Sequence, residues 1–366
     1  MNMSAGKIRV LVVDDSVVMR RLLAEAISSD YECEVAGFAA NGQVALSLLD
    51  RVAPDVMTLD VEMPVLDGLA TLKAMRGRGH APHVIMVSTL TERGGAATVE
   101  ALALGASDYV TKPTSSGDYK SARERMEAAL LPKIKALCRK QRLRPTQAAH
   151  QPHADVCCRK SRFDGAIDIV AIGCSTGGPN ALAEVLSHLP SGFPTPVVIV
   201  QHMPPAFTRF LAQRLTTLCP LPVREAVENE PLAPGEIWIA PGGHHLTLGR
   251  AGKDVRMRIT NTPPENSCRP SVDVLFRSVA QVYRGALGVV MTGMGQDGLL
   301  GCEALSEAGA AIIAQDEASS VVWGMPGFVA RAGLADSVVP LDEIADHIVD
   351  RVTRSRSPGL RRAAGA

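Results

Sequence analysis

The chain has 366 residues, and equal numbers of acidic and basic side chains give it a formal net charge of zero at pH 7. One hydrophobic core rarely extends over so many residues, so we expect two domains. A neutral chain carries no broad positive field, which argues against nucleic acid or anionic lipid as a partner. No apolar run approaches the roughly 18 residues that a membrane helix needs, so we expect no membrane insertion.

The eight cysteines are scattered and form no CxxC pair, which is typical of reduced thiols rather than of a disulfide framework. The first 13 residues lack the long apolar core of a signal peptide. Together these features predict a soluble, cytoplasmic protein.

The first third of the chain alternates between predicted strands and predicted helices. Short runs rich in β-branched residues predict strands at 7–13, 55–59, 84–87 and 109–111. Amphipathic stretches predict helices at 17–27, 43–49, 69–75, 96–104 and 122–137. This alternation predicts a parallel sheet with helices on its faces.

Polar side chains follow the ends of these four strands: Asp14, Asp15, Asp60, Ser88 and Lys112. Parallel strands end at one edge of a sheet, so we expect these groups to lie together. Clustered carboxylates repel one another and favour a hard dication with oxygen ligands, typically Mg²⁺. Solvated loop charge is the alternative for any single carboxylate, but the arrival of all five groups at strand ends favours a site.

The second half of the chain contains a serine in a glycine-rich turn. The apolar run 167–172 predicts a buried strand, 180–189 predicts a helix, and Ser175 lies between them in a Gly-x-Ser-x-Gly pattern. This is the pattern of a nucleophile elbow, in which a tight turn exposes the hydroxyl. A phosphate-binding loop or a plain strand-to-helix turn are the alternatives.

Two further predicted strands end in candidate catalytic residues. The run 196–201 is followed by His202, and the run 287–292 is followed by a glycine-rich segment that contains Asp297, before a helix that starts at Leu299. Serine, histidine and aspartate at one sheet edge are the nucleophile, base and orienting carboxylate of a hydrolase triad. Their order differs from the Ser, Asp, His order of α/β-hydrolases, which predicts a different doubly wound fold.

Other residues invite competing hypotheses. His244 and His245 are expected to have structural or substrate-edge roles, Ser271 and Asp273 to cap the helix that follows them, and Cys174 to pack behind the serine turn. A nucleotide-binding domain would need an acidic residue at the end of the strand after the glycine loop. That strand ends in Gln201 and His202 instead, which favours hydrolysis. No helix-turn-helix pattern indicates a DNA-binding output.

These motifs carry two family resemblances. Residues 5–125 resemble the receiver domain of bacterial two-component response regulators, through the strand-end residues named above. Residues 165–352 resemble the catalytic domain of the CheB chemotaxis protein-glutamate methylesterases, through 173–178, 201–203 and 291–298. The implied fold is a flavodoxin-like doubly wound receiver followed by a doubly wound parallel α/β domain. Residues 126–164 are expected to be mainly a flexible linker, or else a docking segment for acidic receptor tails.

The resemblance implies roles for the first domain. Asp60 would accept a phosphoryl group from a chemotaxis histidine kinase, Lys112 would stabilise the charge on that group, and Ser88 would bond the finished acyl phosphate. Mg²⁺ would be held by Asp14, Asp15, Asp60 and the backbone carbonyl of Glu62.

It also implies a reaction for the second domain. Ser175 would attack glutamyl methyl esters on chemoreceptors, with His202 as base and Asp297 as its partner, and the same site would deamidate glutamines. Thr176 would help to fix the serine and histidine, and the backbone N–H of Met294 would face the oxyanion. No cofactor is expected for this chemistry. The ordinary histidine pKa of about 6.5 predicts that kcat/KM climbs through roughly pH 6 to 7.

Overall fold

The computed structural model describes residues 6–76, 81–113, 118–142 and 165–356. The chain divides into two compact units, Met1–His150 and Gln151–Ala366, and each is described by itself. Most of the predicted linker, residues 143–164, lies outside the described residues.

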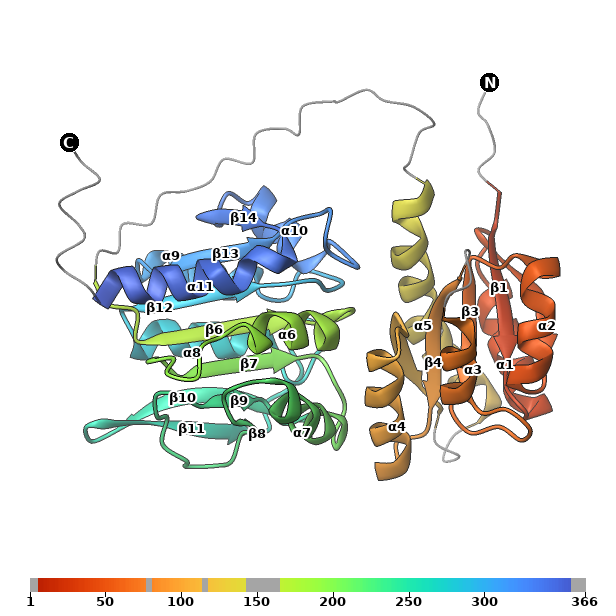
Figure 1. The fold of residues 1–366 in the computed structure, drawn as a ribbon, viewed down its shortest axis with the longest axis horizontal. Helices are drawn as coiled ribbons and strands as arrows, with labels where there is room; N and C mark the ends of the chain where they lie inside the picture. Colours follow the sequence, from red (N-terminus) through yellow and green to blue (C-terminus); the bar gives the residue numbers. More distant parts are fainter. Residues whose placement is uncertain (1–5, 77–80, 114–117, 143–164, 357–366) are drawn as a thin grey trace, which may run out of the picture. The chain divides into compact units, whose positions relative to one another are not determined.

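The first unit is a five-stranded parallel sheet in the order β2-β1-β3-β4-β5. Helices α1 and α5 pack together, whereas α2, α3 and α4 pack in series, so helices cover both faces (Figure 1). The doubly wound prediction is therefore confirmed for this unit. Its elements are β1 (Ile8–Val13), α1 (Val17–Ser28), β2 (Cys33–Ala39), α2 (Gly42–Val52), β3 (Val56–Asp60), α3 (Gly68–Met75), β4 (His83–Ser88), α4 (Glu92–Ala103), β5 (Asp108–Thr111) and α5 (Tyr119–Arg142).

Four helices of this unit begin with a side-chain N-cap. Ser16, Asn41, Asp67 and Thr91 each accept a hydrogen bond from the backbone N–H three residues further on. Such caps satisfy backbone donors that have no partner within the helix. Each helix therefore starts just after the carboxyl edge of the sheet, where the strand-end polar residues lie.

The second unit is a seven-stranded sheet in the order β14-β13-β12-β6-β7-β9-β8, in which every pair is parallel. Figure 1 shows α6, α7 and α11 on the near face of the sheet and α8 behind it. An antiparallel hairpin, β10 with β11, packs against α8. The elements are β6 (Ile169–Cys174), α6 (Gly178–Ser187), β7 (Val197–Gln201), α7 (Phe207–Leu218), β8 (Val223–Glu225), β9 (Ile237–Ile239), β10 (His245–Ala251), β11 (Asp254–Thr260), α8 (Val272–Val282), β12 (Ala286–Val290), α9 (Leu299–Glu307), β13 (Ala311–Gln315), α10 (Met325–Arg331), β14 (Ser337–Val339) and α11 (Leu341–Arg356).

The strand order of this sheet reverses direction at β6. The chain first adds β7, the edge strand β8 and then β9 between them on one side, and afterwards returns to add β12, β13 and β14 on the other. Ligands of open parallel sheets bind at the carboxyl ends of strands beside such a reversal. The three strands that precede Ser175, His202 and Asp297 are β6, β7 and β12, which are neighbours at this reversal.

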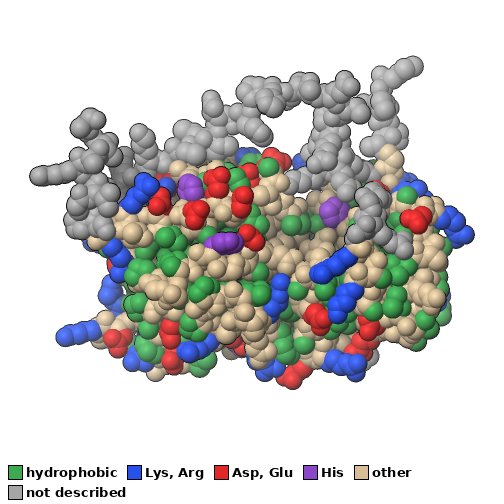
Figure 2. Space-filling model, viewed as in Figure 1, with side chains coloured by type: hydrophobic (Ala, Val, Ile, Leu, Met, Phe, Trp, Pro, Cys, Tyr) green, Lys and Arg blue, Asp and Glu red, His purple; other side chains and the backbone are tan. Residues whose placement is uncertain are grey.

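None of the described helices is long and apolar enough to cross a membrane. On the face drawn in Figure 2, basic and acidic side chains are interspersed among apolar and other groups. This agrees with the zero formal net charge of the chain.

Candidate active site and receiver pocket

Ser175 lies in a tight turn between β6 and α6. Its backbone N–H donates to the carbonyl of Thr292 (3.0 Å), and its carbonyl accepts from the N–H of Gly178 (2.8 Å) and from Nε2 of Gln201 (3.0 Å). Gly177 has a φ of 79°, a conformation that favours glycine. The turn thus holds a partly exposed serine at the carboxyl end of a buried strand, as predicted.

The loop after β12 packs directly on this serine. A Cβ atom added to Gly293 would lie 2.9 Å from the Cβ of Ser175 and 2.3 Å from the sulfur of Met325, so only glycine fits there. The backbone N–H of the next residue, Met294, donates to no acceptor among the described residues. That N–H is therefore not engaged within the described residues, as an oxyanion donor must be.

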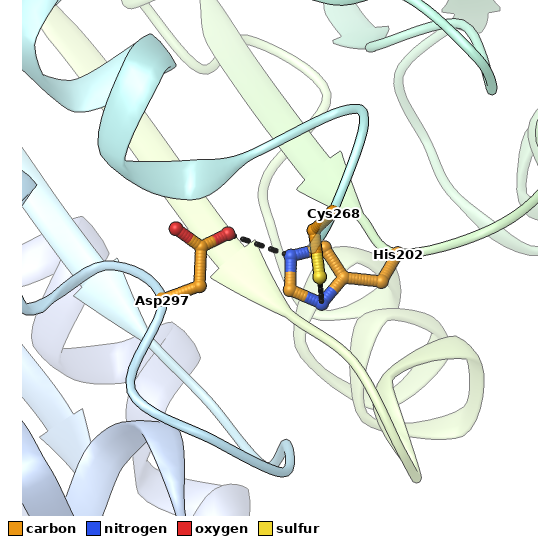
Figure 3. A group of neighbouring side chains, drawn as sticks. All are labelled: His202, Cys268 and Asp297. Carbon is orange, nitrogen blue, oxygen red and sulfur yellow. Dashed lines mark hydrogen bonds and ion pairs between the residues drawn. The ribbon is translucent and has the colours of Figure 1, made fainter. Parts of the chain in front are cut away.

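His202 and Asp297 are in direct contact. Nε2 of His202 lies 2.7 Å from Oδ2 of Asp297, and Nδ1 lies 3.6 Å from the sulfur of Cys268 (Figure 3). The paired residues Cys174 and Gln201 immediately precede Ser175 and His202 on adjacent parallel strands, whose spacing is about 4.8 Å. The structure therefore brings the serine and histidine to neighbouring positions. Among the described residues, the Ser175 hydroxyl makes no hydrogen bond to the imidazole.

Asp297 is buried, and its carboxylate is surrounded by donors at the N-terminus of α8. Oδ2 accepts from the N–H of Val272 (2.7 Å) and Oδ1 from the N–H of Asp273 (3.1 Å). Oδ1 also accepts from Oγ of Ser271 (2.8 Å) and Nδ2 of Asn266 (3.0 Å). Burial by itself raises the pKa of Asp297, but the bonds to His202 and to these N–H groups outweigh it, so the net pKa is lowered.

The predicted capping of α8 by Ser271 and Asp273 is wrong. Ser271 occupies the N-cap position, yet its hydroxyl donates to Asp297 and makes no cap bond. The carboxylate of Asp273 instead accepts from the N–H groups of Gly298 (2.9 Å) and Gly301 (2.6 Å), at the start of α9. Each aspartate thus caps the helix beside the other: Asp297, before α9, accepts from the start of α8, and Asp273, in α8, accepts from the start of α9. Burial and the charge of Asp297 raise the pKa of Asp273 to about 6.

The histidine is more basic than the sequence indicates. Burial alone lowers the pKa of His202, but its bond to Asp297 and its contact with Cys268 raise it to about 9. This raised pKa moves the expected rise of kcat/KM above the range of about pH 6 to 7 that an unperturbed imidazole predicts. Asp297, which stays ionised, stabilises the imidazolium directly.

The other histidines and Cys174 have structural positions, as predicted. Nδ1 of the buried His245 accepts from the N–H of Ser271 (3.2 Å), so Nε2 is the nitrogen that donates to the carbonyl of Pro263 (3.1 Å). Cys174 is fully buried behind the turn, with its sulfur 3.2 Å from Oε1 of Gln201. His244 lies 3.2 Å from the carbonyl of Gly242 through Nδ1.

Sequence reasoning named Gln201 only as the end of a strand, without a role, and missed Asn266 and Cys268. These two residues come from the loop between β11 and α8. Cys268 reaches His202 across 66 residues of chain, and Asn266 reaches Asp297 across 31. No local pattern reports contacts of that kind.

The strand-end residues of the first unit also meet. One carboxylate oxygen each of Asp14, Asp15 and Asp60 lies within 4.8 Å of the others. Nζ of Lys112 lies 3.0 Å from Asp14 and 2.8 Å from Asp60. Burial raises the pKa of Asp60 to about 6 in spite of this ion pair. Three carboxylates share one ammonium here, so the donor set fits a hard dication such as Mg²⁺.

Two further predicted residues border this pocket. The buried Ser88 ends β4 and donates to the carbonyl of Gly94 (3.0 Å) rather than to a carboxylate. The side chain of Glu62 pairs with Arg93 (3.0 Å), outside the acidic cluster. The predicted role of Glu62 as a Mg²⁺ ligand uses its backbone carbonyl, and this side-chain ion pair does not involve that carbonyl.

Comparison with known proteins identifies a family for each of the two units. Residues 170–348 match the CheB methylesterase family model, and residues 10–123 match that of the response regulator receiver domain. A protein-glutamate methylesterase/protein-glutamine glutaminase of Trichodesmium erythraeum is 50% identical over 350 residues, which cover 94% of this chain and 99% of the relative. Its namesake in Nocardioides is 48% identical over 354 residues, which cover 95% and 96%.

Among solved structures, the CheB methylesterase catalytic domain of Thermotoga maritima is 40% identical, with a TM-score of 0.50; the match covers 50% of this chain and 98% of that one. The two domains found by sequence motif are therefore those found by comparison, and in the same order. The chain belongs to the family of protein-glutamate methylesterases/protein-glutamine glutaminases with an N-terminal response-regulator receiver domain.

Proposed function

We propose that this chain hydrolyses glutamyl methyl esters on chemotaxis receptors through Ser175, His202 and Asp297, under control of phosphorylation at Asp60. The observation that carries the proposal is the His202 to Asp297 pair, formed at the sheet edge beside the exposed serine turn. A buried carboxylate that holds an imidazole next to a serine is the arrangement of serine hydrolases.

The protons can be followed through both half-reactions. Because Nε2 of His202 donates to Asp297, Nδ1 is the nitrogen left to take the hydroxyl proton of Ser175. The serine oxygen attacks the ester carbonyl, the N–H of Met294 stabilises the resulting oxyanion, and the proton returns to methanol as it leaves. Water then cleaves the acyl-enzyme by the same route. Thr176 supports this geometry, because its carbonyl accepts from Oγ1 of Thr292 in the loop that carries Met294 (2.9 Å).

The same site supports deamidation of receptor glutamines. An amide and an ester pass through the same tetrahedral oxyanion, and they differ in the group that leaves, ammonia or methanol. The names of the relatives from Trichodesmium erythraeum and Nocardioides include both activities. No step of this chemistry calls on a metal or a cofactor.

In the first unit, Asp60 would accept the phosphoryl group of a chemotaxis histidine kinase. Asp14 and Asp15 would hold Mg²⁺ together with Asp60 and the carbonyl of Glu62, and the bound ion would neutralise charge on the phosphoryl oxygens. The ammonium of Lys112 already touches Asp60 and would do the same.

Ser88 provides the signal. To bond an acyl phosphate on Asp60, its hydroxyl must leave the carbonyl of Gly94, which lies in the first turn of α4. This change of hydrogen-bond partner would move the loop before α4. The loop would then have two positions, one for the free and one for the phosphorylated Asp60.

We assign residues 5–142 to the receiver, because α5 packs on α1 and buries side chains well beyond residue 125, residues 143–164 to a linker and residues 165–352 to the esterase, working in the cytoplasm. An unphosphorylated receiver would hinder access of receptor helices to Ser175, and phosphorylation would relieve this. A tenfold activation needs only about 1.4 kcal/mol of differential stability between the two forms. Deleting residues 1–140 should raise turnover without a phosphodonor. If the truncated chain is no faster, the receiver activates in another way.

The decisive measurement is methanol release from methyl-labelled receptor fractions, with and without a small phosphodonor. Ser175→Ala and His202→Ala should each lower turnover by on the order of 10⁴, and the double variant should be little slower than either. Circular dichroism should show folded proteins. Near-normal release by Ser175→Ala would eliminate the mechanism.

A further inference from the structure

The second nitrogen of His202 faces a cysteine. Nδ1 lies 3.6 Å from the sulfur of Cys268, and the two side chains converge from different elements (Figure 3). Cys268 is held in a tight loop, since it exchanges backbone hydrogen bonds with Glu265 in both directions (2.9 and 3.1 Å). Both residues are partly exposed. A nitrogen and a sulfur therefore meet at a fixed, accessible position at the sheet edge.

Their separation suits a thiophilic divalent cation. With Zn–N of about 2.05 Å, Zn–S of about 2.3 Å and a tetrahedral angle, the two donor atoms lie about 3.5 Å apart. The observed distance of 3.6 Å matches this separation. A simple thiol-to-imidazole hydrogen bond also fits that distance, so further observations must decide.

The surroundings of His202 provide the next observation. Metal-binding histidines almost always donate their other ring N–H to a carboxylate or carbonyl, which directs the lone pair of the free nitrogen at the ion. Nε2 of His202 donates to Asp297 at 2.7 Å, so the lone pair on Nδ1 points toward Cys268.

The carboxylate behind the histidine is itself immobilised. Both oxygens of Asp297 accept hydrogen bonds from the α8 N-terminus and from Ser271 and Asn266. It thus serves as the supporting carboxylate of a carboxylate, histidine and metal arrangement rather than as a third ligand. All three side chains also have a donor atom within 4.8 Å of the others.

We propose that Nδ1 of His202 and the sulfur of Cys268 form an inhibitory binding site for Zn²⁺ or a similar thiophilic divalent cation. Two protein ligands leave the remaining positions to water, so binding should be reversible. On binding, the thiol proton of Cys268 and any proton on Nδ1 of His202 pass to solvent, so the sulfur binds as thiolate and the imidazole in its neutral form.

The inhibition follows from the proposed function and rests on it. A cation bound to Nδ1 occupies the lone pair that must take the proton of Ser175, so the esterase step stops while the cation is bound. The acidic cluster of the first unit differs in chemistry, because it offers carboxylate oxygens that suit Mg²⁺ rather than a soft ion. Excess Mg²⁺ should therefore not relieve the inhibition.

The binding test uses Co²⁺ as the probe, because sulfur ligation gives a charge-transfer absorption in the near ultraviolet. The full chain carries Cys157→Ser and Cys158→Ser, which removes two adjacent cysteines outside the described residues. Cys268→Ser is then compared with Cys219→Ser, another partly exposed cysteine of the same unit. We expect the band in the parent and in Cys219→Ser, and its loss in Cys268→Ser. A band that survives in Cys268→Ser would overturn the proposal.

The activity test titrates Zn²⁺ against methanol release in excess Mg²⁺, and expresses each variant relative to its own uninhibited rate. Cys268→Ser should raise the half-inhibitory concentration by roughly tenfold or more, whereas Cys219→Ser should not change it. A chelator should restore activity. Equal inhibition of all variants, or none of the parent, would contradict the proposal. The cobalt absorption does not depend on esterase activity, so failure of the site can be told apart from failure of the proposed function.

Discussion

Asp297 and Asp60 both lie at the carboxyl edge of a parallel sheet, yet the groups around their carboxylates differ. Asp297 follows β12 and receives hydrogen bonds from an imidazole, a hydroxyl, an amide and backbone N–H groups. Asp60 ends β3 with one ammonium beside it and two other carboxylates nearby. Burial raises the pKa of Asp60 to about 6, whereas the pKa of Asp297 is lowered.

The difference between the two carboxylates is consistent with the role proposed for each site. The surroundings of Asp297 compensate its charge within the protein, which suits a carboxylate that must hold an imidazolium through a reaction. The surroundings of Asp60 leave charge uncompensated, which suits a group that waits for a cation and a phosphoryl donor. Position at a sheet edge therefore brings reactive groups together, and the donors around them decide their chemistry.

The largest expected effect comes from removing the charge of Asp297. In Asp297→Asn the amide keeps its shape, but it brings a donor where the imidazole and several N–H groups already donate. We expect kcat to fall by on the order of 10⁴. Asp273→Asn is the matched control, because that carboxylate lies in the same network without touching His202. We expect kcat of Asp273→Asn to fall by less than about tenfold. An equal fall of kcat in both variants would show that the whole hydrogen-bond network matters, rather than the contact of Asp297 with His202.

The next effect is the pH dependence of the esterase. A base works only when it is neutral, and the pKa of His202 is raised to about 9. We therefore expect kcat/KM to rise roughly tenfold per pH unit between pH 7 and 8 and to level off near pH 9. A plateau reached by pH 7 would show that the imidazole is unperturbed. The same shift stabilises the fold below about pH 6.5, and this contribution is lost as pH rises through about 9.

Much of this site could be predicted from the sequence because strands and glycine-rich turns leave local patterns. The strands before Asp14, Asp60, Ser175 and His202 are short apolar runs, and each ends where a polar residue begins. β2 was not predicted, because this edge strand is only partly buried and contains Gly37.

The remainder could not be predicted because it depends on contacts between distant segments. The exchange of caps between Asp273 and Asp297 requires α8 and α9 to pack side by side, which neither sequence segment indicates alone. The ring orientation of His202, with Nδ1 toward Cys268, depends in the same way on a loop 66 residues further along the chain.

A smaller effect is expected at Asp60. Asp60→Asn removes the proposed phosphoacceptor, so stimulation by a small phosphodonor, about tenfold in the parent, should disappear while basal turnover remains. Asp67→Asn is the matched control, since Asp67 caps α3 and asparagine caps equally well. That variant should keep its stimulation. Stimulation that persists in Asp60→Asn would mean that the donor acts at another residue.

The smallest effect concerns one donor among several. Ser271→Ala removes a hydroxyl that donates to Oδ1 of Asp297 (2.8 Å) and leaves the backbone N–H bonds in place. A hydrogen bond to a charged group contributes about 1.5 to 3 kcal/mol, and the remaining donors should absorb part of its loss. We therefore expect the free energy of unfolding to fall by about 1 kcal/mol and kcat to fall less than about tenfold.

The control for Ser271→Ala is Ser187→Ala, whose exposed hydroxyl donates to the carbonyl of Glu184 near the end of α6. It should change neither stability nor kcat. Removing a donor also leaves more of the Asp297 charge uncompensated, and Asp297, whose pKa is lowered, stays ionised, so it stabilises the His202 imidazolium more strongly. The alkaline rise of kcat/KM should therefore move to higher pH in Ser271→Ala and stay in place in Ser187→Ala. A profile that does not move would mean that the backbone N–H groups alone hold the charge of Asp297, and that the hydroxyl serves packing.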